Sequence, residues 1–303
     1  TQAGTFLAGG DGLTAAGRAT FDRVDLSSSA EAGAGSEGGA GRGDGGAATA
    51  GAAFLIARGA SVDAGNVSID AQAYGGDGTM GGAASGGFAQ LLATGGGVLT
   101  ATDVTAVLAD AFGGSAIANG VGRGGTGTGG IATILADTGG SLSVTERISF
   151  VGATGYGGDN VTGAASGDGV GGETSIGAND GTVTLTGGVS FLDASAYGGG
   201  ESTGTQSADG GNATAGVARL FAENGGSITS ASDVGPSAEA YAADGTGGGD
   251  GGTATGGTAE MSADGGTINV GSSFVSSYAS GGRGANGGAE SWLPAAARSP
   301  LPV

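Results

Sequence analysis

The stretch Ile131-Ala132-Thr133-Ile134-Leu135-Ala136, followed two residues later by Gly139-Gly140-Ser141-Leu142, carries the pattern that decides the fold. Ala132, Ile134 and Ala136 alternate with Ile131, Thr133 and Leu135. Alternation with a period of two that includes β-branched side chains is typical of a β-strand. The paired glycines tolerate the positive φ of a tight turn. The stretch therefore predicts a strand, a turn and the start of a second strand.

The same pattern recurs along the whole chain. Clear copies have the form x-Ala-x-Leu-x-Ala, each followed by a Gly-rich turn and a β-branched residue or Leu. Together with weaker copies they begin near residues 3, 52, 88, 131, 173, 217 and 258, a mean period of about 42 residues. Repeats of this length are typical of solenoids, in which each coil packs only against its neighbours.

A second strand block follows the first, as in Val67-Ser68-Ile69 and Val189-Ser190-Phe191, and leads to an aromatic residue before paired glycines. We expect these aromatic side chains to form a ladder along the solenoid. They could cover the Gly-Gly turns, or bind sugar rings or a neighbouring filament. The ladder comprises Tyr74, Phe112, Tyr156, Tyr197 and, one copy later, Tyr241.

These patterns predict an all-β fold, a parallel β-helix (β-solenoid) of about seven Gly-rich repeats of about 42 residues. Helices are not expected, because each Gly costs a helix about 1 kcal/mol relative to Ala. A disordered Gly-rich chain is the alternative, but disorder gives no reason to keep strands and turns in phase. Inward positions would include Ala89, Leu91 and Ala93, and three copies later Ala218, Leu220 and Ala222.

The Gly-rich stretches between repeats, such as 75–87 and 198–216, could be flexible surface loops, or narrow extended segments in which glycine allows backbones to approach closely; we expect them to be partly ordered. The repeats occupy residues 1–288, whereas 289–303 breaks the pattern and holds the only Trp, Trp292. This tail could cap the open strand edges of the last coil, or be a linker or foreign sequence. The chain starts at Thr1 without a signal segment, so we expect a processed or excised piece of something longer.

Composition argues against several functions. Gly supplies 76 of 303 residues and aromatics only 5 %, so any core must be thin and closely packed. Cys and His are absent, which removes thiol, imidazole and Ser–His catalysis. With 28 acidic residues against nine arginines the formal charge is −19, so nucleic acid is not an expected partner. No apolar run is long enough for a transmembrane helix.

Acidic residues in Gly-rich turns raise the question of calcium. Asp77, Asp159 and Asp250 combine carboxylate oxygens with open backbone nearby, which suits a hard cation. The calcium motif Gly-Gly-x-Gly-x-Asp does not occur, since the stretch that begins at Gly38 ends on Gly43 where Asp is needed. The three residues are candidate calcium ligands, with solvated turn carboxylates as the default, and no other cofactor is expected.

Two further groups of residues suggest activities. Arg42, Gly43 and Asp44 spell the tripeptide that integrin-type receptors recognise, although a chain rich in Gly and Asp produces it easily by chance. Acids on expected strands could serve carbohydrate cleavage, but nothing in the sequence singles out a pair. No enzyme activity is therefore expected. The acids concerned are Asp103, Asp110 and Asp193.

Residues 1–288 resemble the β-helical passenger repeats of bacterial autotransporter and filamentous-haemagglutinin-like surface proteins. The resemblance rests on segments such as Gly139-Gly140-Ser141-Leu142-Ser143-Val144. The resemblance implies export to the bacterial cell surface and a role in adhesion, filament or matrix formation.

We therefore expect a secreted or surface-exposed structural protein that self-associates into a filament or biofilm matrix and could bind a host or surface glycan or receptor. The alternative is a carbohydrate-binding or carbohydrate-cleaving β-helix. Such a protein should have one divergent copy that gains acids and aromatics. The most divergent copy, 173–216, has Gly177 in place of a bulkier outward residue but gains no such cluster.

Overall fold

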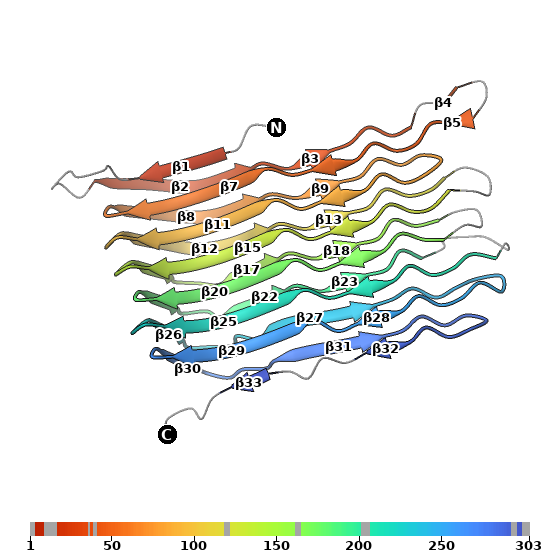
Figure 1. Cartoon of the computed structure of the whole chain (residues 1–303). Coiled ribbons are helices and arrows are strands. Elements are labelled where there is room, and N and C mark those ends of the chain that lie inside the picture. The colour runs from red at the N-terminus through yellow and green to blue at the C-terminus, as the bar shows by residue number, and fades with distance from the viewer. Residues whose placement is uncertain are drawn as a thin grey trace.

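The computed structural model describes residues 4–8, 17–35, 37–38, 41–117, 122–160, 165–200, 207–291 and 296–298. Within these ranges there is no helix, and parallel strands stack coil upon coil into three sheets that run the length of the molecule (Figure 1). The predicted all-β parallel solenoid is confirmed. In the described part of the chain, no helix is long and apolar enough to cross a membrane.

The first sheet takes one strand from each coil, which is the x-Ala-x-Leu-x-Ala block. Its strands pair in register, so that Leu55, Leu91 and Ile134 stand in one line. In order along the sheet the strands are β1 (Gly4–Ala8), β7 (Ala52–Arg58), β11 (Phe88–Thr94), β15 (Ile131–Asp137), β20 (Glu173–Asn179), β25 (Val217–Glu223), β29 (Thr258–Asp264) and β33 (Ala296–Arg298).

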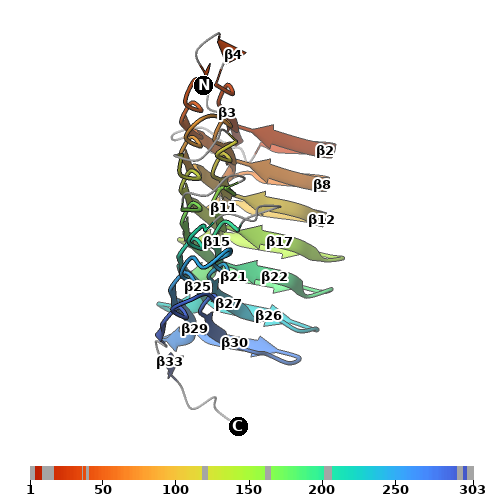
Figure 2. The same cartoon turned by 90° about the vertical axis from the view of Figure 1, so that its right-hand side faces the viewer.

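A tight turn leads from the first sheet into a second sheet of 16 strands, which we call the large sheet. Gly139 supplies the positive φ that this turn needs. The early coils contribute one long strand each, and later coils divide it into two. These strands are β2 (Arg18–Ser27), β8 (Ser61–Asp70), β12 (Val98–Leu108), β16 (Ser141–Val144), β17 (Ile148–Gly152), β21 (Thr182–Leu185), β22 (Val189–Asp193), β26 (Ser227–Ser230), β27 (Pro236–Tyr241), β30 (Thr267–Val270) and β31 (Ser276–Ser280). Figure 2 shows them stacked down one side of the molecule.

Short strands continue the large sheet towards the Gly-rich side: β3 (Ala30–Glu31), β9 (Ala73–Tyr74), β13 (Ala111–Phe112), β18 (Gly155–Tyr156) and β23 (Ala196–Tyr197). A narrow sheet packs against them, formed by β6 (Ala48–Thr49), β10 (Ala84–Ser85), β14 (Gly127–Thr128), β19 (Gly169–Val170), β24 (Ala213–Thr214), β28 (Ala254–Thr255) and β32 (Glu290–Ser291). The one antiparallel pair joins β4 (Glu37–Gly38) to β5 (Gly41–Arg42) within the described residues.

The core tapers across each coil. Between the first and large sheets it consists of Leu, Ile and Val with Ala, and the predicted inward residues are all fully buried. Towards the narrow sheet only Ala remains, for example Ala73, Ala84 and Ala111. Because the side chains shorten, the two walls of the coil converge. The confirmed inward residues are Ala89, Leu91, Ala93, Ala218, Leu220 and Ala222.

Beyond the Ala core lies the glycine layer, where the two walls bond directly to each other. Gly76 N donates to Gly46 O at 2.9 Å, Gly82 N to Gly76 O at 2.8 Å, and Gly114 N to Gly82 O at 2.9 Å. A Cβ on Gly76, Gly82 or Gly114 would overlap the carbonyl oxygen of the equivalent residue in the preceding coil. The described parts of the Gly-rich stretches are therefore ordered, by the close backbone approach that the sequence indicates. The glycine layer comprises Gly46, Gly76, Gly82, Gly114, Gly125, Gly158, Gly167, Gly199, Gly211, Ala243, Gly252, Gly282 and Gly288.

Part of the non-repeat tail continues the sheets. β32 pairs with β28, and β33 pairs with β29, both in parallel. The capping role of segment 289–303 stays a prediction, because Trp292 and the prolines of this tail, Pro294, Pro300 and Pro302, lie outside the described residues.

Candidate functional site

The structure places the five predicted ladder residues in one continuous stack, which we call the aromatic column. Ring centroids of Tyr74 and Phe112 lie 4.9 Å apart, and those of Phe112 and Tyr156 lie 4.7 Å apart, with planes within 4°. Tyr156–Tyr197 and Tyr197–Tyr241 follow at 5.1 and 5.3 Å. The sheet register produces this stack, since strands about 4.8 Å apart bring equivalent side chains to ring-stacking distance.

A line of polar residues runs beside the aromatic column, two positions earlier in each coil. The Tyr74 hydroxyl donates to Gln72 Oε1 at 3.1 Å, and the Tyr241 hydroxyl donates to Glu239. Asp110 links three coils, because its Oδ1 accepts from Thr154 N at 2.7 Å and its Oδ2 accepts from Gln72 Nε2 at 3.2 Å. This face therefore presents hydroxyl donors and carboxylate acceptors along a row of rings.

Burial shifts the titration of this face. It raises the pKa of the Asp110 and Asp193 carboxyls, and the charge of Asp193 raises that of Asp110 further. Burial, followed by the negative charge of Asp110, raises the pKa of Tyr156 to about 12. The hydrogen bond to Glu239 raises the pKa of Tyr241. These tyrosines are thus neutral hydroxyl donors at physiological pH.

A second pair of stacked rings lies on the same sheet, and the sequence reasoning overlooked it. Phe150 and Phe191 stack at 5.0 Å with planes 4° apart, and their exposures are 47 % and 54 %. Their sequence signal is visible, since each ends an equivalent block that begins at Ile148 or Val189. That block suggests a strand, but only the register shows that the rings face solvent side by side.

The three acids considered for carbohydrate chemistry separate into two places. Asp110 and Asp193 line one cavity on the outer face of the large sheet. Asp103 lies elsewhere on that sheet, where its Oδ2 accepts from Asn66 Nδ2 at 3.2 Å and its Oδ1 is 3.8 Å from Arg147 Nε. The structure thus brings together a pair that the sequence could not single out.

The candidate calcium ligands each bridge consecutive coils. Asp77 Oδ1 accepts from Ser115 N at 2.7 Å, and Asp159 Oδ1 accepts from Gly200 N at 3.0 Å. Asp250 Oδ1 accepts from both N and Nδ2 of Asn286. No group of three acidic side chains in the described ranges could hold a metal ion, so the three carboxylates are not brought together. Calcium binding stays a prediction, and the observed contacts make these residues links between coils.

The tripeptide Arg42-Gly43-Asp44 lies where the β4–β5 hairpin returns to the coil. Asp44 Oδ1 accepts from Met80 N at 3.3 Å, which ties it to the next coil. The side chain of Arg42 lies outside the described part of the structure. Receptor binding through this tripeptide stays a prediction.

The large sheet therefore combines stacked rings, hydroxyl donors and oriented carboxylates on its outer face, an arrangement suited to binding. No family model, curated protein or solved structure matches this chain.

Proposed function

We propose that this chain is a structural surface protein, a stiff β-solenoid that associates end to end into filaments. The observation that carries the proposal is the open apolar end of its core at the last coil. The resemblance of its repeats to bacterial surface passengers supports a place outside the cell, as an adhesin or a component of a matrix.

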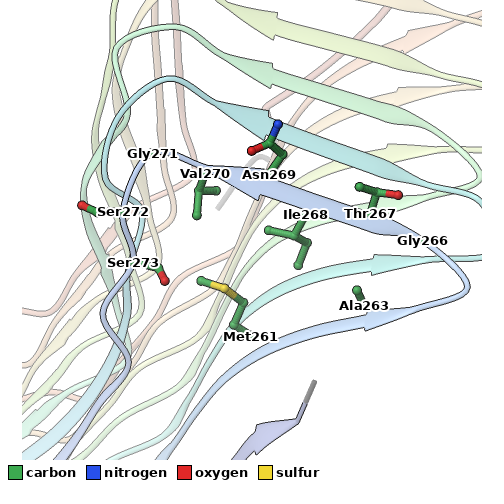
Figure 3. Close-up of a pocket in the computed structure, with 10 residues that line it drawn as sticks. All are labelled: Met261, Ala263, Gly266, Thr267, Ile268, Asn269, Val270, Gly271, Ser272 and Ser273. Atoms are coloured by element: carbon green, nitrogen blue, oxygen red, sulfur yellow. The ribbon is translucent and has the colours of Figure 1, made fainter. Parts of the chain in front are cut away.

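The last coil leaves core side chains without a covering layer in the described residues. Leu220 and Ala222 are fully buried, whereas their counterparts Met261 and Ala263 one coil later are only partly buried. With Ile268 they line a cavity of about 540 Å³ at this end (Figure 3). Covering apolar surface of this kind with another layer lowers the free energy, because the surface is removed from water.

The first coil offers a matching layer. Among the described strands β2 pairs only with β8, and β30 only with β26, so both have an unpaired edge. The sheet register aligns Ala19 of β2 with Ile268 of β30, and Phe21 with Val270. A β2 strand from a second copy would therefore continue the large sheet beyond β30, and the β1 strand of that copy would replace β33 beside β29. Head-to-tail contacts of this kind build open filaments.

A second apolar surface suits sideways contact between filaments. It covers the outer side of the first sheet over β7, β11 and β15, and the rings of Phe54 and Phe88 lie 5.2 Å apart there. It ends at the next coil, where the outward positions are Glu173, Ser175 and Gly177, the last lying under the ring of Phe221. We call it the apolar face: Phe54, Ile56, Phe88, Leu92, Ile131 and Leu135.

Electron microscopy with sedimentation velocity tests the filament proposal. The native chain should form linear filaments whose length increases with protein concentration. Val270→Asp places a charge in the open end and should leave short rods, and Phe21→Asp should do the same from the other end. Val98→Asp is the matched control, because Val98 is exposed on the same sheet away from both ends, and it should still polymerise.

Two results would refute this function. One is a native chain that stays a single short rod at every concentration. The other is a Val270→Asp variant that forms filaments as long as those of the native chain and of Val98→Asp.

A further inference from the structure

One position on the outer face of the large sheet interrupts a line of side chains. The register aligns Asp70, Leu108, Gly152, Asp193 and Ser237 at equivalent places in five successive coils. Only Gly152 lacks a side chain, and the side chains of Leu108 and Asp110 lie against its backbone, so that a Cβ at Gly152 would be 3.0 Å from Leu108 Cδ2 and 3.2 Å from Asp110 Oδ1.

Gly152 is one of the residues that line a cavity of about 360 Å³, which we call the Gly152 cavity. The stacked rings of Phe150 and Phe191 contribute to its lining, as does Tyr156 of the aromatic column. The cavity is open to solvent, because Phe150 and Phe191 are each about half exposed. Its size is at the lower end of the range for small-molecule sites and suits a single ring-sized group.

Two carboxylates give this cavity oriented hydrogen-bond acceptors. Asp110 is fixed by Thr154 N and Gln72 Nε2, while Asp193 is fixed by the hydroxyls of Ser195 and Thr154. Each carboxylate has about four acceptor sites, so these contacts leave capacity for donors from a ligand. An anionic ligand would meet the repulsion of both carboxylates and of a chain with a formal charge of −19.

We infer that the Gly152 cavity binds one ring of a neutral, hydroxyl-rich sugar. The apolar C–H surface of the sugar would pack on the exposed sides of Phe150 and Phe191, and its hydroxyls would donate to Asp110 and Asp193. Tyr156 would present only its edge, because Phe112 and Tyr197 cover both faces of its ring. Uronic acids and other anionic sugars would be rejected. This binding activity goes beyond the structural role and does not depend on filament formation.

A divalent cation explains the site less well. The described residues contain no group of three acidic side chains that could hold a metal ion. The aromatic lining would also add nothing to the binding of a hard cation, which prefers oxygen ligands. Stacked rings beside carboxylates instead match the two surfaces of a sugar ring, one apolar and one hydroxylated.

Isothermal titration calorimetry with the full chain tests the inference. The probes are neutral hexasaccharides (cellohexaose, maltohexaose and mannohexaose), compared with a galacturonic acid oligomer. At least one neutral probe should bind, and the acidic one should not. Gly152→Leu adds a side chain in the cavity lining, where it presses on Leu108 and on the ligand-binding carboxylate of Asp110, and it should weaken binding at least tenfold.

Further variants separate the site from the fold. Phe191→Ala leaves the backbone at Gly152 unchanged and should also weaken binding, by roughly tenfold for a loss of about 1.4 kcal/mol. Phe274→Ala is the matched control, because Phe274 is a similarly exposed ring, at 51 %, outside the cavity lining. It should bind within twofold of the native chain. Thermal unfolding verifies that each variant is folded.

Three results would overturn the inference: no binding of any neutral probe, equal affinities for the native chain and folded Gly152→Leu and Phe191→Ala variants, or preferred binding of the acidic oligomer. Because the titration can be done on short rods, failure here is distinguishable from failure of the filament proposal.

Discussion

Glycine determines how closely the walls of this solenoid approach, and Gly125 shows why. Its N donates to Gly114 O at 2.8 Å in the glycine layer, and a Cβ at this position would overlap the carbonyl oxygen of Gly82. Gly125→Ala must therefore push the neighbouring coil away or break these bonds. We expect a loss of about 3 kcal/mol in the free energy of unfolding, measured by guanidinium denaturation.

The control for this substitution is Gly287→Ala. A Cβ on Gly287 meets no atom within 4 Å, and its φ is in the ordinary range. This variant should stay within about 0.5 kcal/mol of the native chain. Equal losses at Gly125 and Gly287 would show that close wall contact does not limit the choice of residue.

The buried carboxyls predict a pH dependence. Asp110 and Asp193 have folded-state pKa values above the ordinary 3.8, chiefly because burial disfavours their charged forms. The folded state then binds their protons more tightly than the unfolded state. Their contribution to stability is present below pH 3.8 and is lost as the pH rises through the folded-state pKa values.

Asp193→Asn removes one of these carboxyls and its repulsion of Asp110. The melting temperature of the variant, relative to the native chain, should therefore rise as the pH increases from 4 to 7. Calorimetric scans at several pH values measure this difference. A difference that stays constant across that range would mean that Asp193 titrates normally in the folded chain.

Among the elements, the aromatic column joins short strands that have few backbone bonds of their own. Tyr156 lies in its middle and stacks on Phe112 and Tyr197. Tyr156→Ala removes both contacts, and we expect a loss of about 2 kcal/mol. Tyr156→Phe should cost far less, because Phe112 already occupies this column without a hydroxyl. Thermal unfolding of the two variants measures this contrast, and equal losses would mean that the hydroxyl matters more than stacking.

The elements also show what the sequence could predict. Strand blocks, turns and the aromatic column follow from local alternation and from recurrence, so Leu91 and Tyr156 could be placed from the sequence. The pairing of Asp110 with Asp193 could not, because they belong to coils on either side of a third one. Coil lengths vary within the Gly-rich stretches, so the count of residues does not reveal which side chains become neighbours. The place of Gly152 between Leu108 and Asp193 is likewise visible only once the register is known.

For the whole molecule, shape and charge act in opposite directions on assembly. The open end and the apolar face favour contact between copies, whereas a formal charge of −19 makes copies repel one another. Salt at physiological concentration shortens the range of this repulsion to about 8 Å, whereas in 0.01 M salt it extends about 30 Å. Filaments should therefore grow longer and bundle more as ionic strength increases.

The apolar face gives a way to separate bundling from elongation. Leu92→Asp places a charge in the middle of that face, far from both ends of the stack, so it should abolish side-by-side bundles and leave filament length unchanged. Thr100→Asp adds the same charge in the same coil, on the outward side of the opposite sheet, and should bundle like the native chain. Electron micrographs at about 0.15 M salt score both properties at once. If Leu92→Asp filaments bundle as much as those of Thr100→Asp, the apolar face is not the lateral contact, and the end-to-end contact alone would have to account for any matrix that the protein forms.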